Sequence, residues 1–120
     1  MAKTVLYVFG AILVVVGLVG FVNDPVLGLF EVDTLHNLVH IVTGIVFLAV
    51  AAFAVGNASL TAKIFGVIYA VVAVLGFVMP GTLGTLMEVN MADHVLHAGL
   101  ALVLLYVGFM GEKGMAGSVA

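Results

Sequence analysis

The chain has 120 residues, of which 65% are hydrophobic and only 8% are charged, whereas about a quarter of the residues in a soluble domain are charged. This composition excludes most soluble enzymes and indicates a protein that resides in lipid. The formal charge of −3 comes from three Lys, no Arg and six acidic residues, so nucleic acid is not an expected partner. The chain has no Cys, so a metal site would depend on His, Asp or Glu.

Four apolar stretches are long enough to cross a bilayer, which takes about 20 residues each. Every backbone N–H in lipid must be satisfied within its own segment, so we expect helices in spite of the many β-branched residues. The predicted fold class is therefore all-α, a four-helix transmembrane bundle that forms a single membrane domain over residues 1–120. The predicted spans cover residues 4–22, 34–55, 60–79 and 91–110.

The three lysines predict how the chain is oriented. Lys3 precedes the first span, Lys63 begins the third and Lys113 follows the fourth, while the two connections on the other side contain no Lys or Arg. By the positive-inside rule, both termini face the cytoplasm of a multi-pass protein in the cell's inner (plasma) membrane.

Small residues recur inside the spans, among them Gly10, Gly17 and Gly20 in the first and Gly66 and Gly76 in the third. Such residues allow helix backbones to approach closely in lipid. We expect them to serve packing within the bundle. The same faces leave open a homo-oligomer or a contact with another membrane protein.

The two halves of the chain resemble each other, which predicts a duplicated helical hairpin with units at residues 1–57 and 58–115. Leu18–Val22 matches Val74–Val78, and both contain Gly-Phe-Val. Units with an even number of spans should share one topology and be related by an axis along the membrane normal. After a one-residue shift, the paired positions are His36 with Asp93, Asn37 with His94, and His40 with His97.

Most polar residues of the spans form one stripe on the second span and a matching stripe on the fourth. Polar side chains in a membrane normally face the bundle interior, because exposure to lipid is costly. We therefore expect the two stripes to face each other. The stripes contain Asp33, His36, Asn37 and His40, and Asn90, Asp93, His94 and His97.

Helix capping accounts for part of these stripes. Asp33 and Asn90 are placed as N-caps, and Asp93 is placed as the acid of a capping box. At 1.5 Å per residue, His40 and His97 lie about 10 Å from the starts of their helices, beyond the reach of capping. These two histidines therefore need a role that capping does not supply.

One such role is to bind a transition metal ion, Zn, Cu or Fe. His36 and His40 are four residues apart and His94 and His97 three apart, so facing helices would offer up to four imidazole nitrogens. Asp93 would be a fifth ligand or would accept a hydrogen bond from one of the ligands.

Haem b and a purely structural role are the alternatives to a metal ion. Haem b would be bound with His40 and His97 as ligands on opposite sides of its iron. In the structural role, the cluster is only a hydrogen-bonded lock in a structural or accessory membrane scaffold.

Catalysis and transport have less support. The chain contains neither a Ser-His-Asp pattern nor a glutamate pair, so enzymatic activity is not indicated. The cytoplasmic halves of the spans are almost entirely apolar, so transport would require an oligomeric channel.

The segments Asp33–Gly44 and Asn90–His97 resemble a family of small bacterial four-helix membrane proteins that is catalogued only as a domain of unknown function. The resemblance covers nearly the whole chain, and its most specific part is the Asn-x-x-His-x-x-x-Gly run from Asn37 to Gly44. The second copy departs from this pattern, because His94 stands where the first has Asn. The resemblance implies an integral membrane protein and no particular activity.

Overall fold

The computed structural model describes residues 1–23, 33–84 and 89–119, with only the backbone described for 83–84 and 111–119. This part of the chain is all-α and contains no strand, as predicted. Its elements are α1 (Ala2–Gly20), α2 (Thr34–Phe53), the 3₁₀ turn η1 (Val55–Asn57), α3 (Ala58–Val78), α4 (Pro80–Gly84) and α5 (Met91–Val119).

Four segments are long and apolar enough to cross a membrane, which confirms the prediction of an all-α bundle of four such helices: Ala2–Gly20, Thr34–Phe53, Val55–Val78 and Met91–Met110. The shortest, α1, has 19 residues and is about 28 Å long, close to the thickness of the hydrocarbon core. Large apolar side chains are exposed around the outside of the bundle, as lipid contact requires. α5 continues to Val119, nine residues past the end of its apolar span at Met110.

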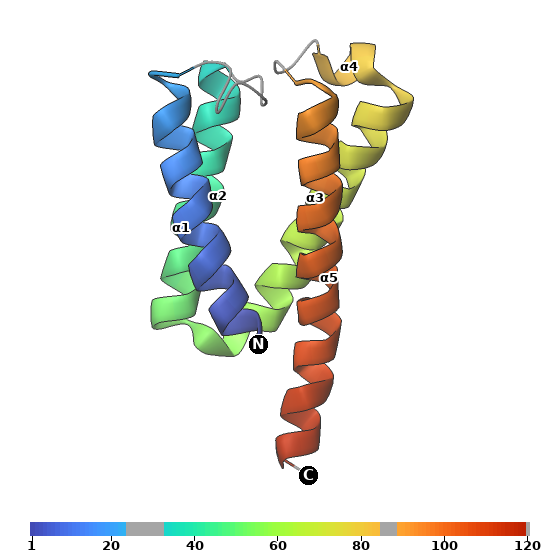
Figure 1. Cartoon of the computed structure of the whole chain (residues 1–120). Coiled ribbons are helices and arrows are strands. Elements are labelled where there is room, and N and C mark those ends of the chain that lie inside the picture. Colours follow the sequence, from blue (N-terminus) through green and yellow to red (C-terminus); the bar gives the residue numbers. More distant parts are fainter. Residues whose placement is uncertain (24–32, 85–88, 120) are drawn as a thin grey trace.

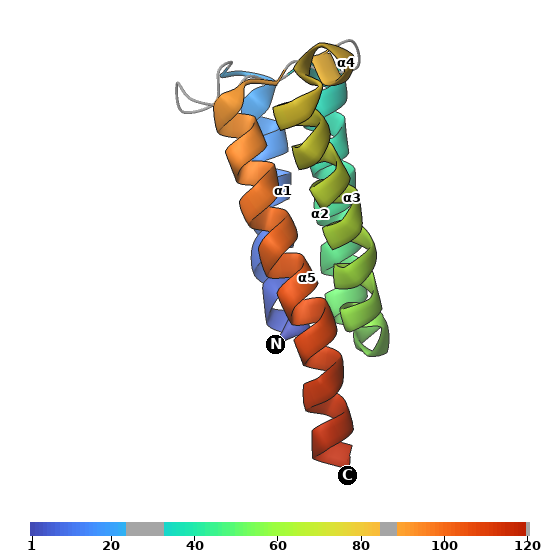
Figure 2. The same cartoon turned by 90° about the vertical axis from the view of Figure 1, so that its right-hand side faces the viewer.

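The helices form two hairpins, α1 with α2 and α3 with α5 (Figure 1). Helices pack against each other extensively within a hairpin and much less between the hairpins. Both chain termini lie at the same end of the bundle, and α4 lies at the opposite end (Figures 1 and 2). The starts of α2 and α5 are therefore at the end away from the termini.

Glycines bring the helices of each hairpin close together. A Cβ added to Gly10 would lie 3.0 Å from the backbone oxygen of Gly44, and one added to Gly44 would lie 2.7 Å from that of Gly10. In the second hairpin a Cβ on Gly66 would lie 3.0 Å from the backbone nitrogen of Leu105. The prediction that Gly10 and Gly66 serve packing within the bundle is thus confirmed.

An apolar core fills the half of the bundle nearer the termini. Leu6, Phe47 and Leu104 are fully buried there. The rings of Phe47 on α2 and Phe65 on α3 meet edge to face with centroids 5.1 Å apart, which joins the two hairpins. The polar residues of α2 and α5 lie beyond this core, toward the other end of both helices.

Candidate metal centre

The start of α2 is fixed by the predicted cap. Asp33 has an extended backbone, and its Oδ1 accepts a hydrogen bond of 2.8 Å from the backbone N–H of His36. One turn later comes His40, so both imidazoles lie on the same face of α2. Their ring centroids are 4.4 Å apart.

The start of α5 has the predicted capping box. The backbone N–H of Asn90 donates to Asp93 Oδ2 at 2.9 Å, and that of Asp93 donates to Asn90 Oδ1 at 3.0 Å. His97 lies about one turn further along the helix. Its ring centroid is 5.8 Å from that of His36 and 6.4 Å from that of His40.

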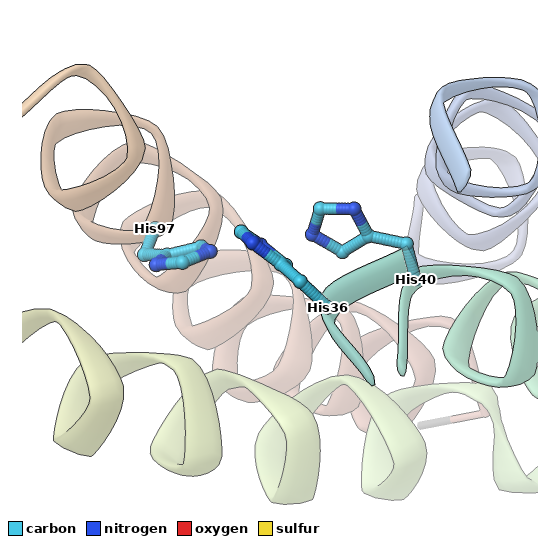
Figure 3. A group of neighbouring side chains, drawn as sticks. All are labelled: His36, His40 and His97. Carbon is cyan, nitrogen blue, oxygen red and sulfur yellow. The ribbon is translucent and has the colours of Figure 1, made fainter. Parts of the chain in front are cut away.

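His36, His40 and His97 form what we call the three-histidine cluster. One nitrogen from each ring can be chosen so that all three lie within 4.8 Å of one another. Each residue is at most 3% exposed. Figure 3 shows the rings of His36 and His40 on α2 gathered with that of His97 on α5, and the three centroids form a triangle. Two residues of one hairpin and one of the other thus converge in the interior of the bundle.

These separations are close to what a metal ion needs. Zn–N bonds of about 2.1 Å in a tetrahedron place the nitrogens about 3.4 Å apart. To reach this geometry from a separation of 4.8 Å, each nitrogen moves by less than about 1 Å, which small rotations about the side-chain bonds provide.

The other two predicted ligands lie outside the cluster. Asp93 is occupied by the capping box that starts α5. The imidazole of His94 lies against Gly76, and its ring centroid is 5.7 Å from that of Phe77 on α3. Asn37, which the predicted repeat pairs with His94, lies against Gly20 in the same way. One position of each stripe thus packs within its own hairpin, while His40 and His97 face the other hairpin.

Tyr69 also belongs to the site, although the polar stripes did not point to it. A cavity of about 170 Å³ between α2 and α3 is bordered by the three histidines together with Thr43 and Tyr69. Tyr69 is 4% exposed, and its ring centroid is 5.7 Å from that of His97. Its hydroxyl lies close to the side chain of Thr43 but makes no hydrogen bond of good geometry within the described residues. One sequence feature could have pointed to Tyr69 as a site residue. It is a phenol in the middle of an apolar span, and a buried hydroxyl needs a hydrogen-bond partner.

The donor set determines what this cluster can bind. Three neutral imidazoles suit Zn, Cu or Fe. Three protein ligands leave at least one coordination position for water or another small ligand, as in catalytic rather than structural zinc sites. The cavity beside Tyr69 and Thr43 provides space for such a ligand.

These features define an integral membrane protein of four spanning helices with three buried histidines between its two hairpins. The profile of a domain of unknown function, DUF4383, matches residues 3–110, and the chain belongs to this family. The match confirms the resemblance inferred from the motifs. No curated protein and no solved structure matches the chain.

Proposed function

We propose that the three-histidine cluster binds one transition metal ion, Zn, Cu or Fe, within the membrane. The observation that carries the proposal is the meeting of three imidazoles from two hairpins, each at most 3% exposed, with their nitrogens within 4.8 Å. Burial of polar groups in an apolar bundle destabilises it unless they bind something. A shared metal ion satisfies all three rings at once.

The proposed ligands are His36, His40 and His97. Asp93 and His94 are not in the set, because the first caps α5 and the second packs against Gly76. The hydroxyl of Tyr69 is placed to hydrogen-bond a water or anion in the open coordination position.

Two details favour a metal ion over a hydrogen-bonded lock or a haem. A hydrogen-bonded lock would pair its buried ring nitrogens, yet Nδ1 of His40 and Nδ1 of His97 have no partner within the described residues. A haem would need its porphyrin plane between His40 and His97. The ring of His36 lies beside both, with centroids 4.4 Å from His40 and 5.8 Å from His97, and occupies part of the space that the porphyrin would need.

The proposal includes a duplicated hairpin. Gly20 lies against Asn37 as Gly76 lies against His94, and these are positions that the predicted repeat pairs. A Cβ on Gly10 would likewise meet Leu48 as one on Gly66 would meet Leu105. In this scheme His40 and His97 are equivalent. Asp93 stands at the position of the second unit that corresponds to His36. The cluster therefore contains three histidines rather than four.

The proposal also places the cluster toward the extracytoplasmic side of the inner membrane. Lys3 and Lys63 are near the starts of α1 and α3, at the end of the bundle where both termini lie (Figure 1). The positive-inside rule places that end in the cytoplasm. His36 and His40 are near the start of α2, at the other end.

Metal analysis of the purified protein tests the proposal. The protein in mild detergent should contain about one Zn, Cu or Fe per chain, lose it to a chelator and rebind it. His40→Ala and His97→Ala should each abolish rebinding. His94→Asn is the matched control, because it removes an imidazole from the same helix but places there the residue found at the paired position Asn37. Full metal content in the His40→Ala/His97→Ala double variant would refute the proposal.

A further inference from the structure

A second cavity, of about 480 Å³, lies between α1 and α5 on the other side of the cluster. It is walled by apolar side chains such as Phe9, Leu13, Leu100 and Val103, and it is bordered by the imidazoles of His40 and His97. Its volume is in the range of small-molecule sites. We call it the α1/α5 pocket.

The pocket exists because the hairpins pack loosely against each other and because residue 99 is a glycine. A Cβ added to Gly99 would meet no atom within 4 Å, so α5 leaves open space there. Ile12 and Val95, which also border the pocket, are 52% and 60% exposed on the outer surface of the bundle. A ligand can therefore enter directly from the lipid.

The depth and charge of the pocket restrict its ligand. It extends along Phe9–Val16 of α1 and Val95–Val103 of α5, in the middle of both spans. None of the residues found along its wall is Lys or Arg. A phosphate or carboxylate would lose its hydration at this depth without a cation to offset the cost. The ligand is therefore a neutral molecule that dissolves in the bilayer.

The imidazoles indicate that this molecule carries an oxygen atom. His40 and His97 are the only described residues bordering the pocket that have polar side chains. Nδ1 of each ring is fully buried, so the nitrogen that a ligand in the pocket would meet is Nε2. A neutral imidazole N–H can donate to a carbonyl oxygen. A cavity of about 300 Å³ between α3 and α5, bordered by Ala70 and Leu75 among others, is bordered only by apolar residues and offers no such donor.

We propose that the α1/α5 pocket binds a lipid-soluble quinone. Its ring carbonyl would accept a hydrogen bond from His40 or His97, and its alkyl tail would leave the pocket beside Ile12 and Val95. A phospholipid acyl chain fits the apolar wall but has no oxygen at this depth. This inference goes beyond metal binding, since it requires the pocket and the imidazoles but no bound ion.

The test measures binding of a radiolabelled decyl-substituted benzoquinone to the full chain in lipid nanodiscs, with empty nanodiscs as the blank. We expect saturable binding of about one quinone per chain. Gly99→Leu fills the pocket from α5 and should weaken binding at least tenfold. Ala70→Leu is the matched control, because it fills the apolar cavity between α3 and α5 and should leave binding unchanged.

Competition identifies the occupant. Unlabelled quinone should displace the probe, whereas palmitate and hexadecanol should not. The inference is overturned by the absence of saturable binding, by unchanged binding to Gly99→Leu, or by equal displacement with hexadecanol. It is also overturned if the pocket holds a second copy of the chain, seen as a dimer that Gly99→Leu dissociates.

Metal content measured in the same samples separates this inference from the proposed function. Metal without saturable quinone binding refutes only the quinone site. Quinone binding to a chain that rebinds no metal refutes only the metal site. Gly99→Leu should keep its metal, because Gly99 provides no ligand.

Discussion

Gly76 lies so close to His94 that a Cβ on the glycine would overlap the imidazole ring. The contact fixes α3 against α5 at the depth where the two hairpins face each other. His94 therefore has a packing role that its spacing from His97 does not reveal.

Gly76→Ala should destabilise the protein by about 1–3 kcal/mol, because the added methyl group must push the helices apart. Reversible unfolding in mixed micelles measures the change. Gly99→Ala is the control, since a Cβ at Gly99 meets no atom, and it should cost nothing measurable. Equal stability of Gly76→Ala and the wild type would contradict the close packing described here.

Loss of the α2 cap should cost about 1 kcal/mol. Asp33→Ala removes the acceptor for the His36 backbone N–H, and the first turn of α2 then frays where His36 is positioned. We expect lower unfolding free energy and weaker metal rebinding. Asp33→Asn retains an acceptor oxygen and should behave almost like the wild type. Wild-type stability in Asp33→Ala would mean that the cap contributes nothing.

Metal binding should fall as the pH falls. Imidazole coordinates metal only when neutral, so protons compete for all three ligands. Because burial disfavours the charged imidazolium, the ion should be released only well below the ordinary histidine pKa of about 6.5. Binding should return on neutralisation, with helicity by circular dichroism unchanged throughout. His94→Asn should show the same pH profile as the wild type. Metal content that stays constant on acidification throughout the range in which the helices remain intact would contradict a centre held by histidines alone.

Tyr69→Phe should leave the metal in place but weaken the binding of an anion at the metal's open coordination position. If the phenol donates a hydrogen bond to an anion on the metal, its loss costs about 0.5–1.5 kcal/mol, or roughly twofold to tenfold in affinity. Azide titration of the cobalt-substituted protein, followed by visible absorption, measures this. Tyr106→Phe is the control, because Tyr106 is 59% exposed on α5. Unchanged azide affinity in Tyr69→Phe would exclude that hydrogen bond.

The sequence was sufficient to predict the spans and both helix caps, because these depend on local patterns. Apolar length sets the spans, and Asp33 and the Asn90–Asp93 pair sit at the spacing that capping needs. These features require no knowledge of which helices are neighbours.

The composition of the cluster could not be predicted in the same way. Asn37 and His94 share a stripe with the cluster residues, but small differences in angle around the helix turn them toward Gly20 and Gly76 within their own hairpins. Tyr69 comes from a helix without a polar stripe, so only the packing of α3 against α2 brings it to the site. Such outcomes depend on tertiary packing, which residue spacing along a helix does not encode.

The proposed orientation predicts which connections meet the outside of the cell. The chain has no Cys, so Asn23→Cys after α1 and Asn57→Cys in η1 give single labelling sites at opposite ends of the bundle. Both positions are exposed. A membrane-impermeant maleimide should label Asn23→Cys in intact cells and Asn57→Cys only after permeabilisation, with the parent chain as the blank. The reverse pattern would place the lysines and termini outside and the three-histidine cluster nearer the cytoplasm.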